Sequence, residues 1–225
     1  MLIGEILNIK INDLFDLTHT LAADYLKGFE YPWLSLSGIK EFILKLGPEL
    51  SKDEYDNPEE GIWIAKDAEI YKNANIYGPV IIGHKTQVRP GAFIRGSALV
   101  GDNCVVGNST ELKNVILFDN VQVPHYNYVG DSILGYKAHM GAGSITSNVK
   151  SDRSLVVVKD KEAHYETGLK KFGAMLGDNV EVGCNSVLNP GSVIGRNTNI
   201  YPLSSVRGVI PGSSIYKGAD NIVSK

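Results

Sequence analysis

The sequence of 225 residues contains little that would direct the chain to a membrane, to nucleic acid or to an oxidising compartment. It has no run of about 18 apolar residues, and its start lacks the basic and long apolar regions of an export signal, so neither a membrane span nor secretion is expected. The net charge of −3 argues against a general nucleic-acid binder, because binding to the phosphate backbone needs a concentrated basic surface. The chain has only two cysteines, Cys104 and Cys184, and we expect them to be reduced, buried thiols in a cytoplasmic protein.

Several signatures of catalytic and nucleotide-binding sites are also missing. No His-x4-His pair occurs, which argues against a three-histidine zinc site, and we expect no metal. The sequence has no P-loop, no Gly-rich dinucleotide-binding turn and no Gly-x-Ser-x-Gly elbow. The familiar nucleotide-binding and serine-hydrolase motifs therefore do not account for this chain.

What the sequence has instead is a repeat of six residues. The aliphatic residues of this repeat are Ile64, Ile70, Ile76, Ile82, Val88, Ile94, Val100, Val106 and Leu112, and later Leu176, Val182, Leu188, Ile194, Ile200 and Val206. A period of six fits neither an α-helix nor the alternation of an ordinary strand. It predicts a mainly β protein, a parallel β-helix of hexapeptide repeats in which three hexads close each triangular coil. Residues one coil apart should then lie in one column, about 4.8 Å from each other.

The chain divides into three expected parts. Residues 1–60 show apolar spacings of three and four, and they predict a small N-terminal α-helical cap that ends in a polar linker. Residues 61–212 are expected to form the β-helix, and residues 213–225 a terminal tail. Within the cap, the pattern predicts an amphipathic helix over 11–26 and a second helix over 36–46 that ends at a Gly-Pro pair.

The six-residue spacing fails at two places, within 118–134 and within 148–169. A regular array tolerates insertions as loops that project from a corner, so we expect such a loop at both places. In the cap, Trp33 follows a Tyr-Pro pair; it could anchor the cap on the first coil, and packing in a core is the default expectation for it.

Two cations are expected to lie in one column of the β-helix. Arg95 and Lys113 are one coil apart, and each directly follows an inward aliphatic residue. Like charges on neighbouring coils repel each other unless an anion bridges them, which suggests a phosphate-binding pair. The alternative is two solvated side chains that point apart. Arg89, one hexad earlier, should lie on a different side and is a weaker candidate.

His125 lies in the first break of the repeat, close to Tyr126 and Tyr128. An imidazole gains or loses its proton between about pH 5 and 8, which suits a general base. A histidine in a loop can equally be an ordinary polar surface residue. Glu111 precedes the hexad of Leu112 and could orient the imidazole or stabilise its charge.

Three segments resemble a known family. Residues 106–114 read VGNSTELKN, residues 124–131 read PHYNYVGD, and residues 141–148 read GAGSITSN. They are similar to the acetyltransferase part of the bifunctional UDP-N-acetylglucosamine pyrophosphorylase/glucosamine-1-phosphate N-acetyltransferase family, whose pattern is roughly V-G-N-F-V-E-x-K, H-L-x-Y-x-G-D and G-A-G-T-I-x-x-N-Y. The resemblance covers about residues 62–210 and includes irregular segments as well as hexads. It implies a left-handed β-helix that assembles as a homotrimer.

The resemblance also implies a role for each matching residue. His125 matches the general base of the family, and Glu111 matches the carboxylate beside that base. Counting back without a gap places the phosphate-binding arginine of the family at Arg95 rather than Arg89. The residues expected to bind the sugar phosphate are Arg95, Lys113, Tyr128, Asn148, Lys171, His139 and Arg89. The residues expected to bind acetyl-CoA are Ala142, Cys184 and Arg207.

The expected reaction is transfer of an acetyl group from acetyl-CoA to the amine of an amino-sugar 1-phosphate, with glucosamine 1-phosphate as the expected acceptor. A backbone N–H of the Gly-Ala-Gly turn at 141–143 is expected to stabilise the thioester oxyanion. Two alternatives stay open: an acyltransferase acting on a different sugar phosphate or sugar nucleotide, and a non-catalytic trimeric scaffold that binds a sugar phosphate.

The sequence departs from the family at four places. Val149 replaces a tyrosine, and His139 stands where the family has an asparagine. The polar segment between Asn148 and Lys171 is longer than in the family. No nucleotide-binding signature stands near the N-terminus, so we expect no nucleotidyltransferase activity from this chain.

Overall fold

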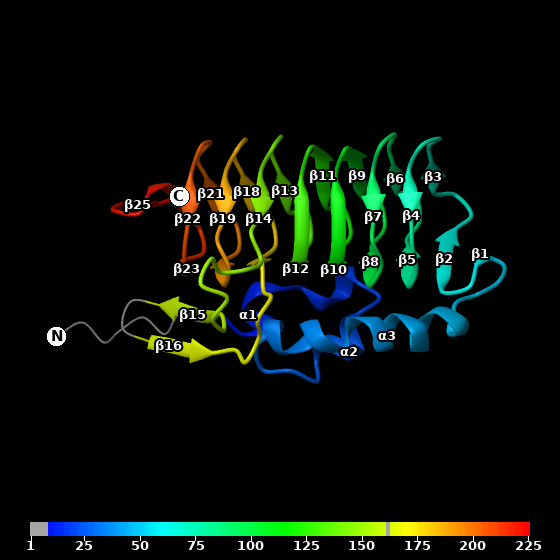
Figure 1. The fold of residues 1–225 in the computed structure, drawn as a ribbon, viewed down its shortest axis with the longest axis horizontal. Coiled ribbons are helices and arrows are strands. Elements are labelled where there is room, and N and C mark those ends of the chain that lie inside the picture. The colour runs from blue at the N-terminus through cyan, green and yellow to red at the C-terminus, as the bar shows by residue number, and fades with distance from the viewer. Residues whose placement is uncertain (1–8, 161–162) are drawn as a thin grey trace.

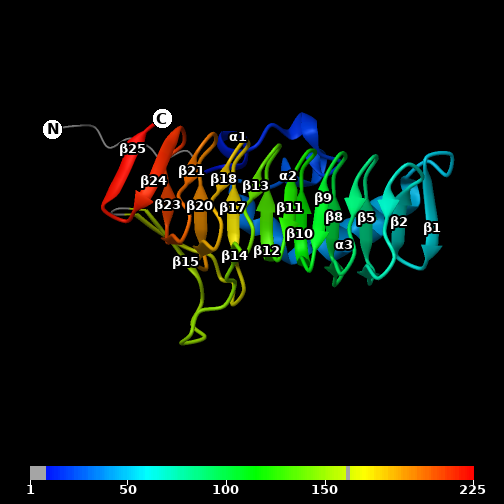
Figure 2. The same cartoon turned by 90° about the horizontal axis from the view of Figure 1, so that it is seen from above.

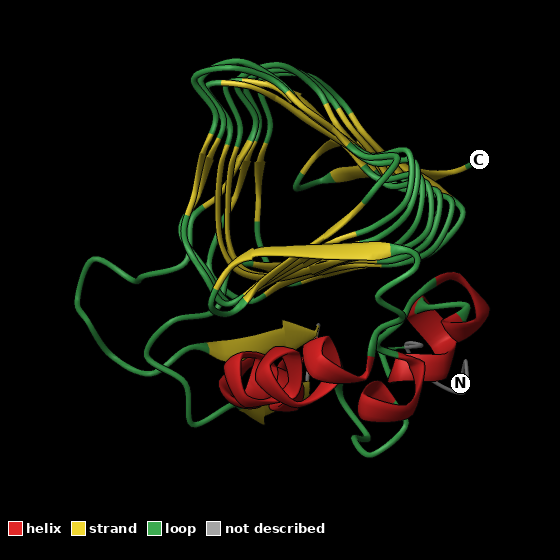
Figure 3. Ribbon diagram, turned by 90° about the vertical axis from the view of Figure 1, so that its right-hand side faces the viewer, coloured by secondary structure: helices red, strands yellow, loops and turns green. Residues whose placement is uncertain are grey.

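The computed structural model describes residues 9–160 and 163–225. It confirms the expected fold: a left-handed parallel β-helix with a triangular cross-section and a small set of N-terminal helices (Figures 1 and 3). The helices lie beneath one side of the triangle, as the view down the β-helix shows (Figure 3). No helix in the described part of the chain is long and apolar enough to cross a membrane.

The coils contribute short strands to three flat sides. The first side contains β2 (Ile62–Ala65), β5 (Val80–Ile82), β8 (Ala98–Val100), the second halves of β10 (Glu111–Leu117) and β12 (Tyr128–Leu134), β17 (Ala174–Leu176), β20 (Ser192–Ile194) and β23 (Val209–Ile210). The second side contains β3 (Glu69–Ile70), β6 (Gln87–Val88), β9 (Val105–Asn108), β11 (Gln122–His125), β13 (His139–Met140), β18 (Glu181–Val182), β21 (Asn199–Ile200) and β24 (Ser214–Gly218). The third side contains β4 (Asn75–Ile76), β7 (Phe93–Ile94), the first halves of β10 and β12, β14 (Ile145–Thr146), β19 (Val187–Leu188) and β22 (Ser205–Val206).

Antiparallel strands close both ends of the β-helix. The segment expected to be a polar linker contains β1 (Tyr55–Glu59), which pairs with β2. The expected C-terminal tail contains β25 (Asn221–Ser224), which pairs with β24. Both strands cover coil edges that would otherwise present unpaired backbone groups.

The first expected loop is absent, because the coils there are one residue shorter. Ile94 pairs with Leu112, whereas Leu112 pairs with Val129, only 17 positions later. The missing residue lies at the corner after Lys113, where the single residue Asn114 replaces a Gly-Ser pair of the previous coil. Asn114 has a φ of 55°, which asparagine tolerates better than most residues. The break in the six-residue spacing therefore marks a tighter corner and not a projecting loop.

The second expected loop is present. Between β14 and β17 the chain leaves the coil and forms a hairpin of β15 (Val157–Asp160) and β16 (Ala163–Glu166). Figure 2 shows a loop of this insertion, in yellow-green, projecting from the stacked coils, whereas β15 contacts β23. Its root is fixed because the Phe172 N–H donates to the carbonyl of Asn148 at 2.9 Å, which joins the two ends of the insertion.

The cap is more broken than the sequence predicts. The elements before the β-helix are α1 (Ile11–Leu14), η1 (Leu17–His19), α2 (Ala23–Leu26), η2 (Pro32–Gly38), α3 (Ile39–Leu46) and η3 (Gly47–Glu49). The single helix expected over 11–26 is wrong, because Phe15 and Thr20 have extended backbone conformations. The carboxylate of Asp16 accepts from the Thr18 N–H and starts a new turn instead. The second expected helix is confirmed as α3, and it begins later because η2 occupies the residues before it.

The cap and the insertion hairpin together cover the first side of the β-helix, and β15 of the hairpin contacts β23 at its C-terminal end. Side chains that point outward from this side are aliphatic and completely buried: Ile81, Leu99, Ile116, Ile133, Met175 and Val193. Helix α3 lies against β8 and β10 and buries Ile39 and Ile43 (Figure 1). The first side therefore has a second apolar layer outside the coil, which is the main attachment of the cap.

The default expectation for Trp33, packing in a core, is confirmed, because it is 1% exposed. It does not anchor the first coil: its ring stacks on Tyr31 at 4.8 Å and lies 6.0 Å from the ring of Phe172, where the insertion rejoins the coils. Of the two cysteines, Cys104 is buried and burial raises the pKa of its thiol, but Cys184 is exposed. Cys184 is exposed because it lies at a corner of the coil and not in an inward position.

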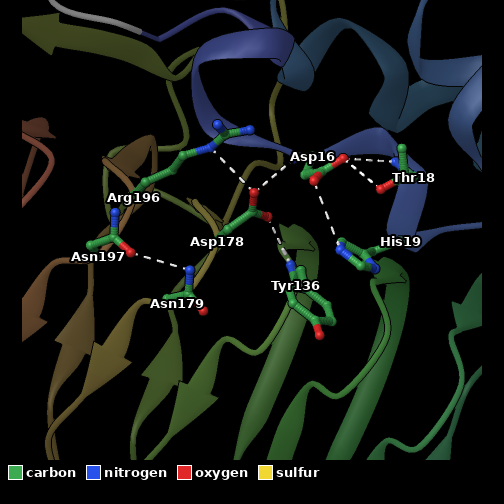
Figure 4. A network of polar contacts seen from close by, with 8 residues as sticks. All are labelled: Asp16, Thr18, His19, Tyr136, Asp178, Asn179, Arg196 and Asn197. Atoms are coloured by element: carbon green, nitrogen blue, oxygen red, sulfur yellow. Dashed lines mark hydrogen bonds and ion pairs between the residues drawn. The ribbon is translucent and has the colours of Figure 1, made fainter.

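A buried carboxylate holds the cap to a corner of the coils (Figure 4). Asp178 accepts hydrogen bonds from the backbone N–H groups of Asp16, at 2.7 Å, and of Tyr136, at 2.9 Å. Its carboxylate also lies 3.2 Å from Nε of Arg196. Burial raises the pKa of Asp178, although the N–H donors and Arg196 oppose that shift. In the reverse direction, the Asp178 N–H donates to the carbonyl of Leu14.

Replacing Asp178 by alanine is expected to lower the free energy of unfolding by about 1–3 kcal/mol, because two backbone N–H groups lose their acceptor. Denaturation in urea measures the change. Asp152→Ala, at an exposed aspartate of the insertion, is the control and should change stability little. Equal stabilities of the two variants would show that the carboxylate of Asp178 does not hold the cap to the coils.

Candidate functional site

His125 ends β11, at the corner between the second and third sides. Tyr126 has a φ of 52° and turns the chain, while Asn127 points inward and is buried. The side chain of Asn127 accepts from the His125 N–H at 3.1 Å and donates to the carbonyls of Gly141 and Ser144. The backbone of His125 is therefore firmly held, although His125 as a whole is exposed to solvent. Within the described residues its imidazole has no hydrogen-bond partner.

Glu111, Lys113 and Tyr128 lie just beyond this corner, on the third side. Glu111 pairs in register with Tyr128, and Lys113 with Gly130. A Cβ added to Gly130 would lie 2.5 Å from the Tyr128 hydroxyl, so only glycine lets the tyrosine fold over this position. The neighbour of Lys113 in the next coil thus presents no side chain of its own, and the Tyr128 hydroxyl and the Asn148 amide lie over it instead.

Arg95 and Lys113 lie in one column, as their spacing predicts. The Arg95 N–H donates to the carbonyl of Leu112, and the residues before them pair in register. The guanidinium, however, binds the carboxylate of Glu111, with Nη1 at 2.7 Å from Oε1. It also lies 5.9 Å from the ring centre of Phe93. The guanidinium of Arg95 is therefore not a free, solvated cation, because the carboxylate of Glu111 occupies it.

This ion pair changes the expected role of Glu111. Among the described residues no hydrogen bond joins Glu111 to the imidazole of His125, in contrast to the expectation from sequence. The hydrogen bond with Glu111 raises the pKa of Arg95, so the guanidinium stays charged. In this arrangement Glu111 competes with any anion that approaches Arg95.

Replacing Glu111 by glutamine is expected to strengthen binding of a sugar phosphate by about 2- to 5-fold, the range of an exposed ion pair that no longer competes. Calorimetric titration with glucosamine 1-phosphate measures this. Glu30→Gln, which removes an exposed carboxylate paired with Lys10 in the cap, is the matched control. Weaker binding or a loss of turnover in Glu111→Gln would instead favour a supporting role for Glu111 beside the imidazole.

Asn148 contacts Tyr128 at the start of the insertion, and Lys171 lies at the other end of the insertion. The Asn148 amide donates to the Tyr128 hydroxyl at 3.1 Å and to the carboxylate of Asp131 at 2.5 Å. Burial, together with the charges of Asp131 and Glu111, raises the pKa of Tyr128, so the phenol keeps its proton. Lys171 is exposed and directly precedes Phe172, whose N–H binds the Asn148 carbonyl.

Asp131 is a residue of this site that sequence reasoning missed. It is 5% exposed, and its carboxylate binds the side chains of Asn114 and Asn148. The signal was present, since Asp131 ends the segment PHYNYVGD that carries the resemblance. Because it is buried, the carboxylate of Asp131 has no direct access to a substrate.

Three predicted ligands of the sugar phosphate or acetyl-CoA lie apart from this cluster. His139 is on the second side, where its Nδ1 is 2.7 Å from Glu181. Arg89 is also on the second side and donates to Gln87. Arg207 continues the column of Arg95 and Lys113 on the third side, several coils farther toward the C-terminus.

Ala142 and Cys184 follow His125 along the same corner column. The Gly143 N–H donates to the His125 carbonyl, and the Asn185 N–H donates to the Ala142 carbonyl, so the three coils stack there. Within the described residues no hydrogen bond uses the Ala142 N–H, whereas those of Gly141 and Gly143 are both occupied. No group of three or more His, Cys, Asp or Glu side chains in that part of the chain is placed to hold a metal ion.

The fold and this cluster define the class: a hexapeptide-repeat protein of the left-handed β-helix type. Residues 76–183 match the family model of the GMPPB C-terminal domain. The chain is 37% identical over 174 residues to the bifunctional protein GlmU of Methanococcus aeolicus, covering 69% of this chain and 42% of that protein. It is 34% identical over 204 residues to GlmU of Methanococcus maripaludis, covering 89% of this chain and 49% of that protein. These matches show a GlmU-like domain in this chain, which spans less than half the length of these relatives.

The solved structures that align with this chain are more distant in sequence. The acetyltransferase domain of PglB from Neisseria gonorrhoeae, solved with acetyl coenzyme A, aligns with a TM-score of 0.34 and 14% identity. The alignment covers 73% of this chain and 58% of that one.

Proposed function

We propose that this chain transfers an acetyl group from acetyl-CoA to the amine of an amino-sugar 1-phosphate, with glucosamine 1-phosphate as the acceptor. The observation that carries the proposal is the corner at His125, where an imidazole with no hydrogen-bond partner among the described residues stands next to a side that presents Arg95 and Lys113. A general base and phosphate-binding cations within one small area fit this chemistry. The relatives named GlmU favour it over other acyl transfers.

In the proposed reaction, His125 removes a proton from the amine as the nitrogen attacks the thioester carbonyl. The new C–N bond forms and the C–S bond breaks, and the imidazolium returns its proton to the departing sulfur of CoA. The Ala142 N–H, which has no other partner among the described residues, would stabilise the negative charge on the carbonyl oxygen.

The acceptor would be held by residues of the third side and of the insertion. Lys113 and Lys171 would bind the phosphate as point charges, and Arg95 would exchange the carboxylate of Glu111 for a phosphate oxygen. Tyr128 would donate its hydroxyl proton to the sugar or to the phosphate. Acetyl-CoA would lie along the corner column of Ala142 and Cys184, with Arg207 toward its phosphates.

We also propose that three copies assemble and share the substrates between them. The cap covers only the first side, so the corner of His125 and the two sides that meet there remain open to a second copy (Figure 3). Light scattering of the purified chain tests this: a monomer at micromolar concentration would contradict it.

Product analysis tests the proposed acceptor. The chain is incubated with acetyl-CoA and, separately, with glucosamine 1-phosphate, galactosamine 1-phosphate, glucosamine and UDP-glucosamine, and products are identified by mass. The proposal expects acetylation of glucosamine 1-phosphate above all others. Preference for another acceptor would favour an acyltransferase that acts on a different sugar phosphate or sugar nucleotide. Val149 and the long insertion, where the sequence departs from the family, are the reason to consider that alternative. Binding of a sugar phosphate without turnover of any acceptor would favour a scaffold.

A further inference from the structure

We infer that Asp131 is a positioning residue that couples the N-terminal cap to the hydroxyl of Tyr128. The inference rests on the proposed function, because it assigns the cap a role in binding the acceptor. It gives the cap a task beyond covering the first side of the β-helix.

A continuous chain of hydrogen bonds leads from the cap to Tyr128. The Asn114 amide donates one proton to the carbonyl of Leu36 in η2, at 3.1 Å, and the other to Oδ1 of Asp131, at 2.9 Å. The Asn148 amide donates one proton to Oδ2 of Asp131 and the other to the Tyr128 hydroxyl. Both amide NH₂ groups are thus fully used, and both oxygens of the buried carboxylate are occupied.

The carboxylate fixes the orientation of both amides. A carboxylate oxygen only accepts hydrogen bonds, so each asparagine must turn its NH₂ group, and not its oxygen, toward Asp131. Asn148 is then obliged to donate to the Tyr128 oxygen. Because that oxygen already accepts from Asn148, the phenolic proton points away and is available to an incoming ligand.

A second contact from the cap reaches the same asparagine. The ring of Trp33 in η2 packs against Phe172, with the ring centres 6.0 Å apart, and both side chains are buried. The Phe172 N–H donates to the backbone carbonyl of Asn148. The cap therefore fixes the side chain of Asn148 through Asp131 and its backbone through Phe172.

The first test replaces Asp131 by asparagine, which keeps the shape but allows the Asn148 amide to turn over. Tyr128 would then donate its hydroxyl proton to the amide oxygen, and that proton would no longer be available to the ligand. We expect binding of glucosamine 1-phosphate to weaken about tenfold, as for the loss of one strong hydrogen bond, with KM for acetyl-CoA unchanged. Tyr128→Phe should weaken binding similarly, and the double variant should be no worse than either single one.

Additive losses in the double variant would overturn the inference, since Asp131 would then act independently of the tyrosine hydroxyl. Unchanged sugar-phosphate binding in Asp131→Asn would overturn it as well. The titration does not depend on turnover: if the wild type binds the sugar phosphate but acetylates no acceptor, the proposed function fails while the coupling is still measured.

The second test removes the link to the cap. Asn114→Gly deletes the amide without strain, because glycine accepts the φ of 55°. Asn120→Gly is the matched control: Asn120 has a φ of 61°, similar burial and no side-chain hydrogen bond in the described residues. We expect weaker sugar-phosphate binding, about 3- to 10-fold, only in Asn114→Gly. Equal binding by the two variants would show that the cap does not act through Asp131.

Discussion

Replacing His125 by alanine is expected to lower kcat for acetyl transfer by about 10²- to 10⁴-fold, the usual contribution of a general base, with little change in either KM. The reason is that the imidazole would take the amine proton without holding either substrate. Its backbone is fixed by Asn127, so the substitution should leave the corner intact. Steady-state kinetics with acetyl-CoA and glucosamine 1-phosphate measure the effect.

His164→Ala is the control for this experiment, because His164 is an exposed histidine of the insertion hairpin. It should keep wild-type turnover. A kcat within about twofold of the wild type in His125→Ala would show that another group is the base.

The second large effect concerns stability. Trp33→Ala is expected to lower the free energy of unfolding by about 3–5 kcal/mol, the range for truncation of a buried tryptophan. Trp33 is 1% exposed and fills the space between Tyr31, Tyr165 and Phe172, so alanine would leave a cavity where the cap meets the insertion. Denaturation in guanidinium chloride, followed by circular dichroism, measures the change.

Trp63→Ala is the matched control, because Trp63 lies on β2 near the first coil and is only partly buried. It should cost clearly less. A larger loss in Trp63→Ala than in Trp33→Ala would restore the expectation that the cap is anchored on the first coil. Binding of glucosamine 1-phosphate should weaken in Trp33→Ala but not in Trp63→Ala, since of these two tryptophans it is Trp33 whose ring packs against Phe172.

The sequence predicts the coils well because inward positions have one requirement, a compact aliphatic side chain at each sixth residue. Ile76, Ile94 and Leu112 accordingly pair in register. The same spacing places Arg95 beside Lys113 without any structural information. Their ionic partners cannot be predicted in this way, since the carboxylate that binds Arg95 comes from the neighbouring coil.

The failures have specific physical causes. At the corner of Asn114 the chain uses one residue instead of two, and this shifts the register of the following hexads. The spacing of the sequence alone does not distinguish such a shift from an inserted loop. The position of the cap had a visible signal: the strands of the first side read VII, ALV, VIL, SIL, AML and SVI, with apolar residues pointing outward as well as inward. Such triplets indicate a side buried on both faces. The contacts of Asp131 depend on pairings that bring four separate segments together, and no local pattern encodes them.

The central claim is that this corner performs acetyl transfer to an amino-sugar 1-phosphate. Release of CoA thiol, followed with purified wild-type chain and acetyl-CoA, tests it when recorded with and without glucosamine 1-phosphate. The account predicts thiol release that depends on the acceptor, saturates with it and yields one acetylated sugar per thiol. Thiol release that is absent, or equal with and without the sugar phosphate, would contradict the account.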